Sequence, residues 1–220
     1  MALRKARSAV TRAKRFIVSQ RFGFSPVAIY ERSFYEGGGF ENTERSAHAI
    51  ASWMVEHLAP SSVLDLGSGP GYYLRALSAL GIETLGVEAS PSGVSATGSG
   101  VLALTYDLRQ PLHLSRRFDV VMSVEVAEHL PKRSGATLVA SVCRNASNFA
   151  IFTAAPPGTP GTDHINCQDA AYWVALFSRH GFELRDDLSR SLRAHSTAAR
   201  AAPWWQSWAW CFERSRTESS

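Results

Sequence analysis

Apolar and polar positions follow two patterns along the chain: longer stretches with helical spacing, and short apolar runs bounded by turn residues. Within residues 43–58, Ala47, Ile50 and Met54 recur at helical intervals, which predicts a helix. Residues 118–124 form an almost unbroken apolar run, which is typical of a strand covered on both faces. The two patterns alternate from residue 43 onward.

The alternation predicts an α/β fold with a mostly parallel seven-stranded sheet and helices on both faces. The predicted helices are 43–58, 72–80, 133–143 and 169–180. The predicted strands are 62–66, 83–87, 101–105, 118–124, 149–154, 182–185 and 207–214. Residues 189–202 carry no pattern from which an element can be predicted.

A chain of 220 residues can bury one core and carry a short appendage, so we expect a single main domain. We place that domain at 43–214, after a basic N-terminal segment (1–42) and before a disordered tail (215–220). No apolar run approaches the roughly 20 residues that span a bilayer, and the first 20 residues are too basic for a signal peptide. The three cysteines are far apart, which argues against a disulfide framework and favours a cytoplasmic location.

Positive charge is concentrated at the start of the chain. Seven basic residues precede the first acidic residue, Glu31: Arg4, Lys5, Arg7, Arg12, Lys14, Arg15 and Arg21. The segment has a helical apolar stripe with a basic opposite face. It could contact an anionic membrane surface, a nucleic acid or an acidic glycan, or it could be a solvated helix that packs on the domain.

The segment with the clearest chemical signal runs from the strand 62–66 into the helix 72–80. Three glycines at alternate positions, Gly67, Gly69 and Gly71, lie between them. Glycines let the backbone turn sharply and approach a ligand, and the helix that follows offers unpaired N–H groups. A glycine-rich turn of this kind is also used by folds that bind nicotinamide or flavin dinucleotides.

The acidic residue within the strand and the spelling Gly-Ser-Gly-Pro-Gly resemble the first motif of class I S-adenosylmethionine (SAM)-dependent methyltransferases, which have a Rossmann-like fold. Phe118-Asp119-Val120-Val121 is similar to the family's fourth-strand pattern, and together with Asp107 it counts against an oxidoreductase. The resemblance implies that Glu88 binds the ribose hydroxyls and Asp107 the adenine amino group. It implies the following SAM-binding residues: Asp65, Gly67, Ser68, Gly69, Gly71, Tyr72, Glu88, Ala89, Asp107, Leu108 and Glu125.

The resemblance extends over roughly residues 30–213, to a bacterial methyltransferase subgroup often found with glycan and natural-product genes. It implies a lid over the cofactor at Phe34 and Tyr35. The chain departs from the subgroup at 158–163 and at Asn166-Cys167-Gln168, which lacks the usual glutamate. These departures fall where the acceptor would lie, so the resemblance does not define the acceptor.

Candidate catalytic groups follow the fourth and fifth strands. Glu125, Glu128 and His129 form a Glu-x-x-Glu-His motif, and a helix there would set the two carboxylates one turn apart. With His164 they could bind a divalent cation (Mg²⁺, Mn²⁺, Fe²⁺ or Zn²⁺). Alternatively, His129 or His164 is a general base without a metal, or is structural. The motif also resembles metal-dependent small-RNA 2′-O-methyltransferases and ubiquinone-pathway O-methyltransferases.

The tryptophans divide into two groups. Trp173 lies in a helical pattern, and Trp208 and Trp210 alternate on a predicted strand, so we expect these three in the core. Trp204 and Trp205 follow Pro203 in a predicted loop, where they could stack on a sugar or pack in the interior.

The sequence thus predicts a SAM-dependent methyltransferase that methylates an oxygen of a small-molecule or glycan acceptor, expected to be a sugar hydroxyl. Transfer to a nitrogen, an RNA 2′-O-methyltransferase and a SAM-binding partner protein without catalysis are alternatives. The oligomeric state is not defined by the sequence.

Overall fold

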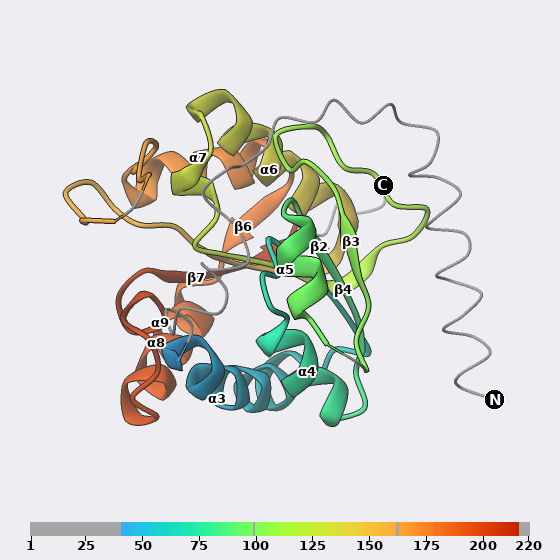
Figure 1. The fold of residues 1–220 in the computed structure, drawn as a ribbon. Coiled ribbons are helices and arrows are strands. Elements are labelled where there is room, and N and C mark those ends of the chain that lie inside the picture. The colour runs from blue at the N-terminus through green and yellow to red at the C-terminus, as the bar shows by residue number, and fades with distance from the viewer. Residues whose placement is uncertain (1–40, 99, 162, 216–220) are drawn as a thin grey trace, which may run out of the picture.

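The computed structural model describes residues 41–98, 100–161 and 163–215 (Figure 1). The expected basic N-terminal helix, the lid-like residues Phe34 and Tyr35, and the tail after residue 215 lie outside these residues.

The described residues form one seven-stranded sheet with the order β3-β2-β1-β4-β5-β7-β6. The strands are β1 (Ser62–Leu66), β2 (Glu83–Glu88), β3 (Ala103–Thr105), β4 (Phe118–Val124), β5 (Ala146–Thr153), β6 (Phe182–Leu184) and β7 (Ala209–Arg214). β7 runs antiparallel to both β5 and β6, and the strand pairs from β3 to β5 are parallel. The predicted mostly parallel sheet of seven strands is confirmed.

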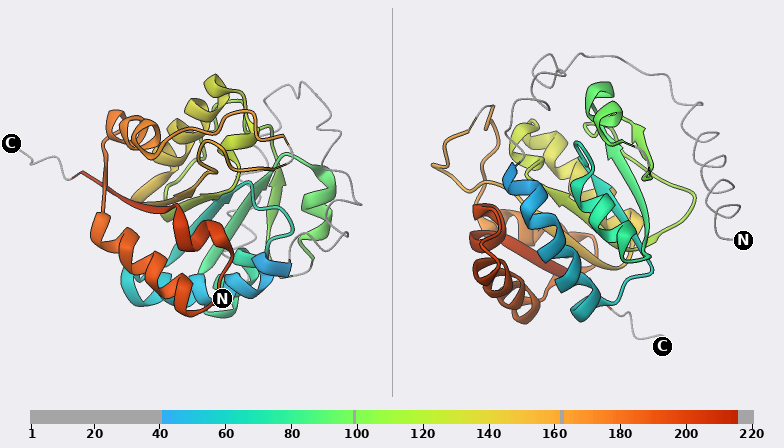
Figure 2. Two further views of the ribbon diagram at one scale, coloured as in Figure 1. Left: turned by 90° about the vertical axis from the view of Figure 1, so that its left-hand side faces the viewer. Right: turned by 60° about the horizontal axis from the view of Figure 1, so that its bottom comes forward.

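Helices cover both faces of this sheet (Figure 2). They are α3 (Glu41–Leu58), α4 (Tyr72–Ala79), α5 (Pro91–Ala96), the 3₁₀ helix η1 (Ala127–His129), α6 (Lys132–Asn145), α7 (Ala170–Arg179), α8 (Asp186–Ala198) and α9 (Pro203–Ser207). Buried residues of α3, α4, α8 and α9 share one core cluster, and those of α6 and α7 share another. No helix of the described residues is both long and apolar enough to cross a membrane.

Alternation along the strands divides the core between the two faces. Val120 and Ile151 contribute to the cluster under α3 and α4, while their neighbours Val121 and Phe152 contribute to the cluster under α6 and α7. All four side chains are fully buried. Successive strand residues point to opposite faces, so a central strand with helices on both sides must be apolar throughout.

Three helices were not predicted from the sequence, and two of them have a clear local cause. α5 begins at Pro91 in a Gly/Ser-rich stretch, where the Ser90 hydroxyl caps the helix by accepting from the Gly93 amide at 3.3 Å. In α8 the buried stripe consists largely of serines. Ser189 and Ser196 are fully buried and donate to carbonyls four residues earlier, so they pack without an apolar signature.

The expected loop around Trp204 and Trp205 is wrong, because these residues belong to the third such helix, α9. Pro203 begins that helix, as its fixed φ favours. Trp205 is fully buried and its Nε1 donates to the Tyr73 hydroxyl at 2.6 Å, while Trp204 is half-buried against the same core. Trp205 therefore packs in the interior and is not placed to stack on a sugar. Trp208 precedes β7 and is half-buried, whereas Trp210 lies in the core.

Candidate cofactor and catalytic site

The carboxyl ends of β1 and β4 lie side by side at the centre of the sheet. The chain leaves β1 toward β2 and β3 on one side, and leaves β4 toward β5 on the other. In open α/β sheets, ligands bind in the crevice at such a topological switch point. The glycine-rich turn after β1 and the Glu-x-x-Glu-His segment after β4 both begin at this edge.

The glycine-rich turn depends on backbone conformations that other residues rarely adopt. Gly67, Gly69 and Gly71 have φ angles of +90°, +48° and +75°. The Gly67 amide donates to the Val87 carbonyl at 2.7 Å, which holds the turn against the end of β2. A Cβ at Gly67 would lie 2.2 Å from Cγ2 of Val126, so a side chain is excluded by contact as well as by φ.

Glu88 ends β2 directly beside this turn. Its Oε2 accepts from the Gly69 amide at 2.9 Å and its Oε1 accepts from the Ser90 amide at 2.8 Å. Burial raises the pKa of Glu88, and these backbone donors partly offset that effect. Each carboxylate oxygen has a second lone pair, so the group can still accept two hydroxyl donors from a ligand.

Asp65 and Ser68 are buried next to Glu88. Asp65 is 1% exposed, and its Oδ1 has no hydrogen-bond partner among the described residues. Burial, followed by the charge of Glu88, raises the pKa of Asp65 to about 8. The Ser68 hydroxyl is also buried without a partner in this part of the chain. The turn therefore holds polar atoms that a ligand or water could satisfy.

The loop after β3 brings Asp107 to the same edge. The Tyr106 amide donates to the Glu88 carbonyl at 3.0 Å, which fixes the start of this loop. The Asp107 carboxylate forms a 2.8 Å ion pair with Arg109, and hydrogen bonds from Arg109 lower its pKa. The side chain of Leu108 is 3% exposed and packs in the core, so only its backbone can face a ligand.

Two further predicted cofactor residues border the turn. Ala89 follows Glu88 and is half-buried. Tyr72 is the first residue of α4 and is half-buried, with the Arg75 guanidinium 4.7 Å from its ring centroid. Both lie at the edge of the sheet where the other predicted cofactor residues gather.

Glu125 follows β4 directly and has an unusual backbone conformation for a non-glycine residue, with φ of +53°. Its amide donates to the Thr153 hydroxyl at 2.9 Å. Its Oε1 accepts a 2.9 Å hydrogen bond from Nε1 of Trp208. Burial raises the pKa of Glu125, and the Trp208 bond partly offsets this. Trp208 was expected in the core, and its contact with Glu125 was not predicted, since no local pattern connects residues 83 positions apart.

The segment after Glu125 is not an α-helix. Glu128 and His129 lie in the 3₁₀ helix η1, and Glu125 precedes it, so an α-helix does not set the spacing of the two carboxylates. The two carboxylates nevertheless interact, and each affects the pKa of the other. Glu128 is fully buried, and its Oε1 accepts from the Ala155 amide at 3.2 Å. Burial, together with the nearby charge of Glu125, raises the pKa of Glu128 well above its ordinary value.

His164, in the loop after β5, meets this segment. The ring centroids of His129 and His164 are 5.0 Å apart in an edge-to-face arrangement. Nδ1 of His164 lies 3.1 Å from the Thr159 carbonyl, which can only accept, so Nδ1 carries a proton and the neutral form of the ring has its lone pair on Nε2. The amides of Ile165 and Asn166 both donate to the Glu128 carbonyl at 2.9 Å and hold the loop in place.

Three of the four predicted metal ligands form one compact group. Candidate ligand atoms of Glu128, His129 and His164 all lie within 4.8 Å of one another, and Glu125 is outside this group. Oε2 of Glu128 is buried and has no hydrogen-bond partner among the described residues. One carboxylate and two imidazoles fit a divalent transition metal or zinc. The same residues also fit a metal-free proton acceptor.

Residues 40–145 match a family model described as a methyltransferase domain. An uncharacterised methyltransferase of Mycobacterium avium (strain 104) is 35% identical in an alignment of 115 residues that covers 47% of this chain and 44% of that relative. A ubiquinone biosynthesis O-methyltransferase of Rhodopseudomonas palustris (strain BisB5) is 28% identical in an alignment of 138 residues that covers 54% of this chain and 53% of the relative. The chain spans about half the length of these curated relatives.

Solved structures share the fold over most of the described chain. The magnesium protoporphyrin IX methyltransferase ChlM from Synechocystis PCC 6803, with bound SAM, has a TM-score of 0.60 at 18% identity and covers 93% of each chain. The sugar N-methyltransferase KedS8 from Streptoalloteichus sp. ATCC 53650 has a TM-score of 0.63 at 16% identity, covering 90% of this chain and 97% of its own. Residues 40–145 therefore match the methyltransferase-domain family in sequence, and the described residues have the Rossmann-like fold of methyltransferases.

Proposed function

We propose that this protein is a SAM-dependent methyltransferase that methylates a sugar hydroxyl of a glycan or glycosylated natural product. The observation that carries the proposal is the contact between the glycine-rich turn and Glu88. Three glycines in left-handed conformations bring the Gly69 amide within 2.9 Å of a buried carboxylate at the switch point of the sheet. This is a site for a ligand with an adjacent pair of hydroxyls, such as a ribose.

Asp65, Ser68 and Asp107 support a nucleoside ligand in particular. Asp65 and Ser68 keep buried polar atoms unsatisfied beneath the turn. The Asp107 carboxylate lies one loop away from Glu88 and can accept from an adenine amino group. Bound SAM would supply a methyl group already activated on a sulfonium.

The chain itself would position the acceptor and take its proton. In the neutral form of His164 the lone pair is on Nε2, because Nδ1 donates to the Thr159 carbonyl. Nε2 of His164, or His129 beside it, would accept the proton of an acceptor hydroxyl, which makes that oxygen a better nucleophile. The sugar acceptor is favoured by the likeness in fold to a sugar N-methyltransferase. Transfer to oxygen is favoured by these histidines and by the similarity to a ubiquinone biosynthesis O-methyltransferase.

Calorimetric titration tests the cofactor assignment. We expect the purified chain to bind SAM and its demethylated product, S-adenosylhomocysteine, and not to bind NADH. Binding of NADH without binding of either sulfur compound would overturn the proposal. If both sulfur compounds bind but no member of a panel of glycosylated acceptors is methylated, a SAM-binding partner protein without catalysis becomes the better assignment.

A metal-dependent O-methyltransferase, including one that acts on RNA 2′-hydroxyls, is a second candidate because of the group Glu128, His129 and His164. These residues would hold the ion, which would supply Lewis acidity that lowers the pKa of an acceptor hydroxyl. Activity assays with and without a chelator distinguish a metal-dependent enzyme from a metal-free one. They are done on wild type, Glu128→Gln and His164→Asn. Activity that survives the chelator argues against the metal. RNA binding that falls steeply with salt would favour the RNA acceptor.

A further inference from the structure

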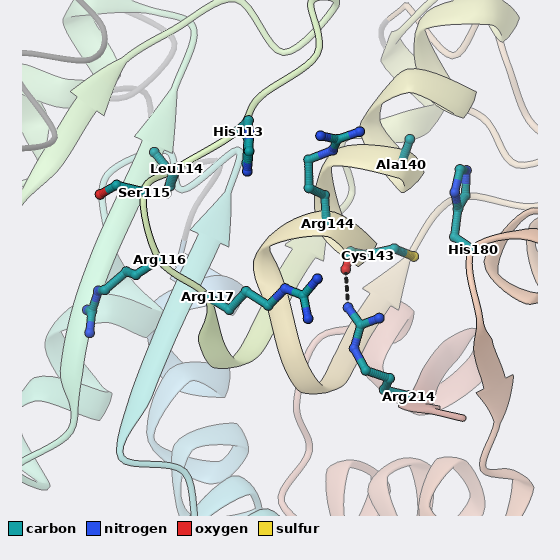
Figure 3. A pocket seen from close by; sticks show the side chains of 10 residues that line it. All are labelled: His113, Leu114, Ser115, Arg116, Arg117, Ala140, Cys143, Arg144, His180 and Arg214. Atoms are coloured by element: carbon teal, nitrogen blue, oxygen red, sulfur yellow. Dashed lines mark hydrogen bonds between the residues drawn. The ribbon is translucent and has the colours of Figure 1, made fainter. Parts of the chain in front are cut away.

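A cavity of about 480 Å³ opens at the edge of the sheet opposite the candidate site (Figure 3). The segment 113–117 that precedes β4 forms one wall, and the C-terminal turns of α6 form another. His180, at the end of α7, and Arg214, at the end of β7, complete the lining. β4 and β5 begin at this edge, whereas the glycine-rich turn and Glu125 lie where parallel strands end.

The described residues that line the cavity are basic or uncharged, and none of them is acidic. Four arginines contribute to it: Arg116, Arg117, Arg144 and Arg214. Arg116 forms a 2.7 Å ion pair with Glu83, and Figure 3 shows its side chain turned away from the others. Arg117 and Arg144 are exposed, and neither has an ion pair with any carboxylate of the described residues.

The guanidinium of Arg214 lies close to other positive charge in the cavity. Its guanidinium donates to the carbonyls of Cys143 at 2.6 Å and Ala146 at 2.7 Å, which satisfies the C-terminal end of α6. Figure 3 shows the guanidinium of Arg117 extending toward the same place. Burial and the charge of Arg117 both lower the pKa of Arg214. An anion between the two would relieve this repulsion, and no side chain of the described residues supplies one.

We propose that this cavity binds a small molecule that bears phosphate groups, through Arg117 and Arg144 with Arg214 as a fixed third charge. Guanidinium groups suit phosphate because their parallel N–H donors match two phosphate oxygens. A concave site of this volume is in the range of small-molecule pockets. The cavity lies at the opposite edge of the sheet from the glycine-rich turn, so the proposal does not depend on the proposed methyl transfer.

Calorimetric titration with pyrophosphate and with ADP, at about 0.15 M salt so that loose surface attraction is screened, tests the proposal. We expect Arg117→Ala/Arg144→Ala to weaken binding of either probe by at least about tenfold, since hydrogen bonds between charged groups are lost. The matched control is Arg133→Ala/Arg200→Ala, which removes the same charge from exposed positions outside the cavity that likewise have no ion pair among the described residues. We expect the control to bind within about twofold of wild type.

The two probes separate the sources of the phosphate. Tighter binding of ADP than of pyrophosphate would indicate that the ligand is a nucleotide. Equal binding of the two probes would indicate that the phosphates alone are recognised. Equal weakening in both double variants would overturn the proposal, because the attraction would then be non-specific. The absence of binding by either probe would also overturn it, and retention of RNA or poly-glutamate in that case would assign the surface to a macromolecule. Unchanged thermal unfolding of the variants verifies that they are folded.

Discussion

The indole Nε1 of Trp208 donates a 2.9 Å hydrogen bond to Oε1 of Glu125, which connects the residue before β7 to the carboxyl end of β4. The hydrogen bond from the Glu125 amide to the Thr153 hydroxyl stabilises the left-handed backbone of Glu125, and the bond from Trp208 orients its carboxylate. Because the bond stabilises the ionised carboxylate, it keeps the raised pKa of Glu125 from rising further. Trp208 is therefore a positioning residue for the candidate site.

We predict that Trp208→Phe weakens binding of S-adenosylhomocysteine by about fivefold, the equivalent of one hydrogen bond of about 1 kcal/mol. Trp173→Phe is the matched control, because Nε1 of Trp173 is buried without a hydrogen-bond partner among the described residues. That control should lose stability through lost packing but retain affinity. Equal affinity of Trp208→Phe and wild type, measured by calorimetry, would contradict a role for Trp208 at the site.

Glu88→Gln should reduce affinity for SAM by at least about tenfold. The amide has one accepting oxygen where the carboxylate has two, so either the Gly69 or the Ser90 amide loses its acceptor. Stability should fall by about 1–3 kcal/mol for the same reason. Glu83→Gln, at the exposed start of β2, is the control and should bind normally. If Glu88→Gln binds as tightly as Glu83→Gln, the ribose assignment is wrong.

The parts of the fold that the sequence predicted are those in which local pattern and environment agree. The strand at 118–124 was predicted with its observed bounds because it is apolar on both faces. The glycine-rich turn was identified because its conformation requires glycine. α8 was missed because buried serines carry no hydrophobic signal.

The candidate site was predictable in part. That Glu128, His129 and His164 meet follows from the rule that parallel strands end at one edge of a sheet, and it was predicted. The 3₁₀ conformation of η1 depends on local backbone geometry that the motif does not reveal. The Trp208–Glu125 contact and the basic cavity depend on how β7 pairs with β5, a long-range relationship without a local signal.

Gly67→Ala should lower the free energy of unfolding far more than Gly81→Ala does. Both Gly67 and Gly81 have positive φ angles, +90° and +83°. A Cβ at Gly67 would overlap Val126, whereas a Cβ at Gly81 would meet nothing within 4 Å. We expect about 1 kcal/mol of strain at Gly81→Ala and at least about 3 kcal/mol at Gly67→Ala, with loss of SAM binding only in the latter. Urea unfolding measures the loss of stability, and calorimetry measures SAM binding. Similar losses of stability in Gly67→Ala and Gly81→Ala would show that the overlap with Val126 is unimportant.

Asp65 should contribute a decrease in the free energy of unfolding as pH rises. The folded pKa of Asp65 is about 8, above its ordinary value of 3.8, because the carboxyl is buried beside Glu88. Below pH 3.8 the Asp65 carboxyl is protonated in both the folded and the unfolded chain, so its contribution to stability is fully present. Between the two values the unfolded chain releases its proton while the folded chain retains it, so the free energy of unfolding decreases as pH rises toward 8.

Removing this carboxyl should remove the corresponding part of the pH dependence. We expect Asp65→Asn to gain stability relative to wild type between pH 4 and pH 8 by an amount on the order of 5 kcal/mol, whatever its stability at pH 4. Asp65→Ser, a second substitution that cannot ionise, should show the same gain from a different starting value. Urea unfolding across this pH range measures the difference. Parallel curves for wild type and both variants would show that Asp65 is ionised in the folded protein, and the burial argument for this carboxyl would then fail.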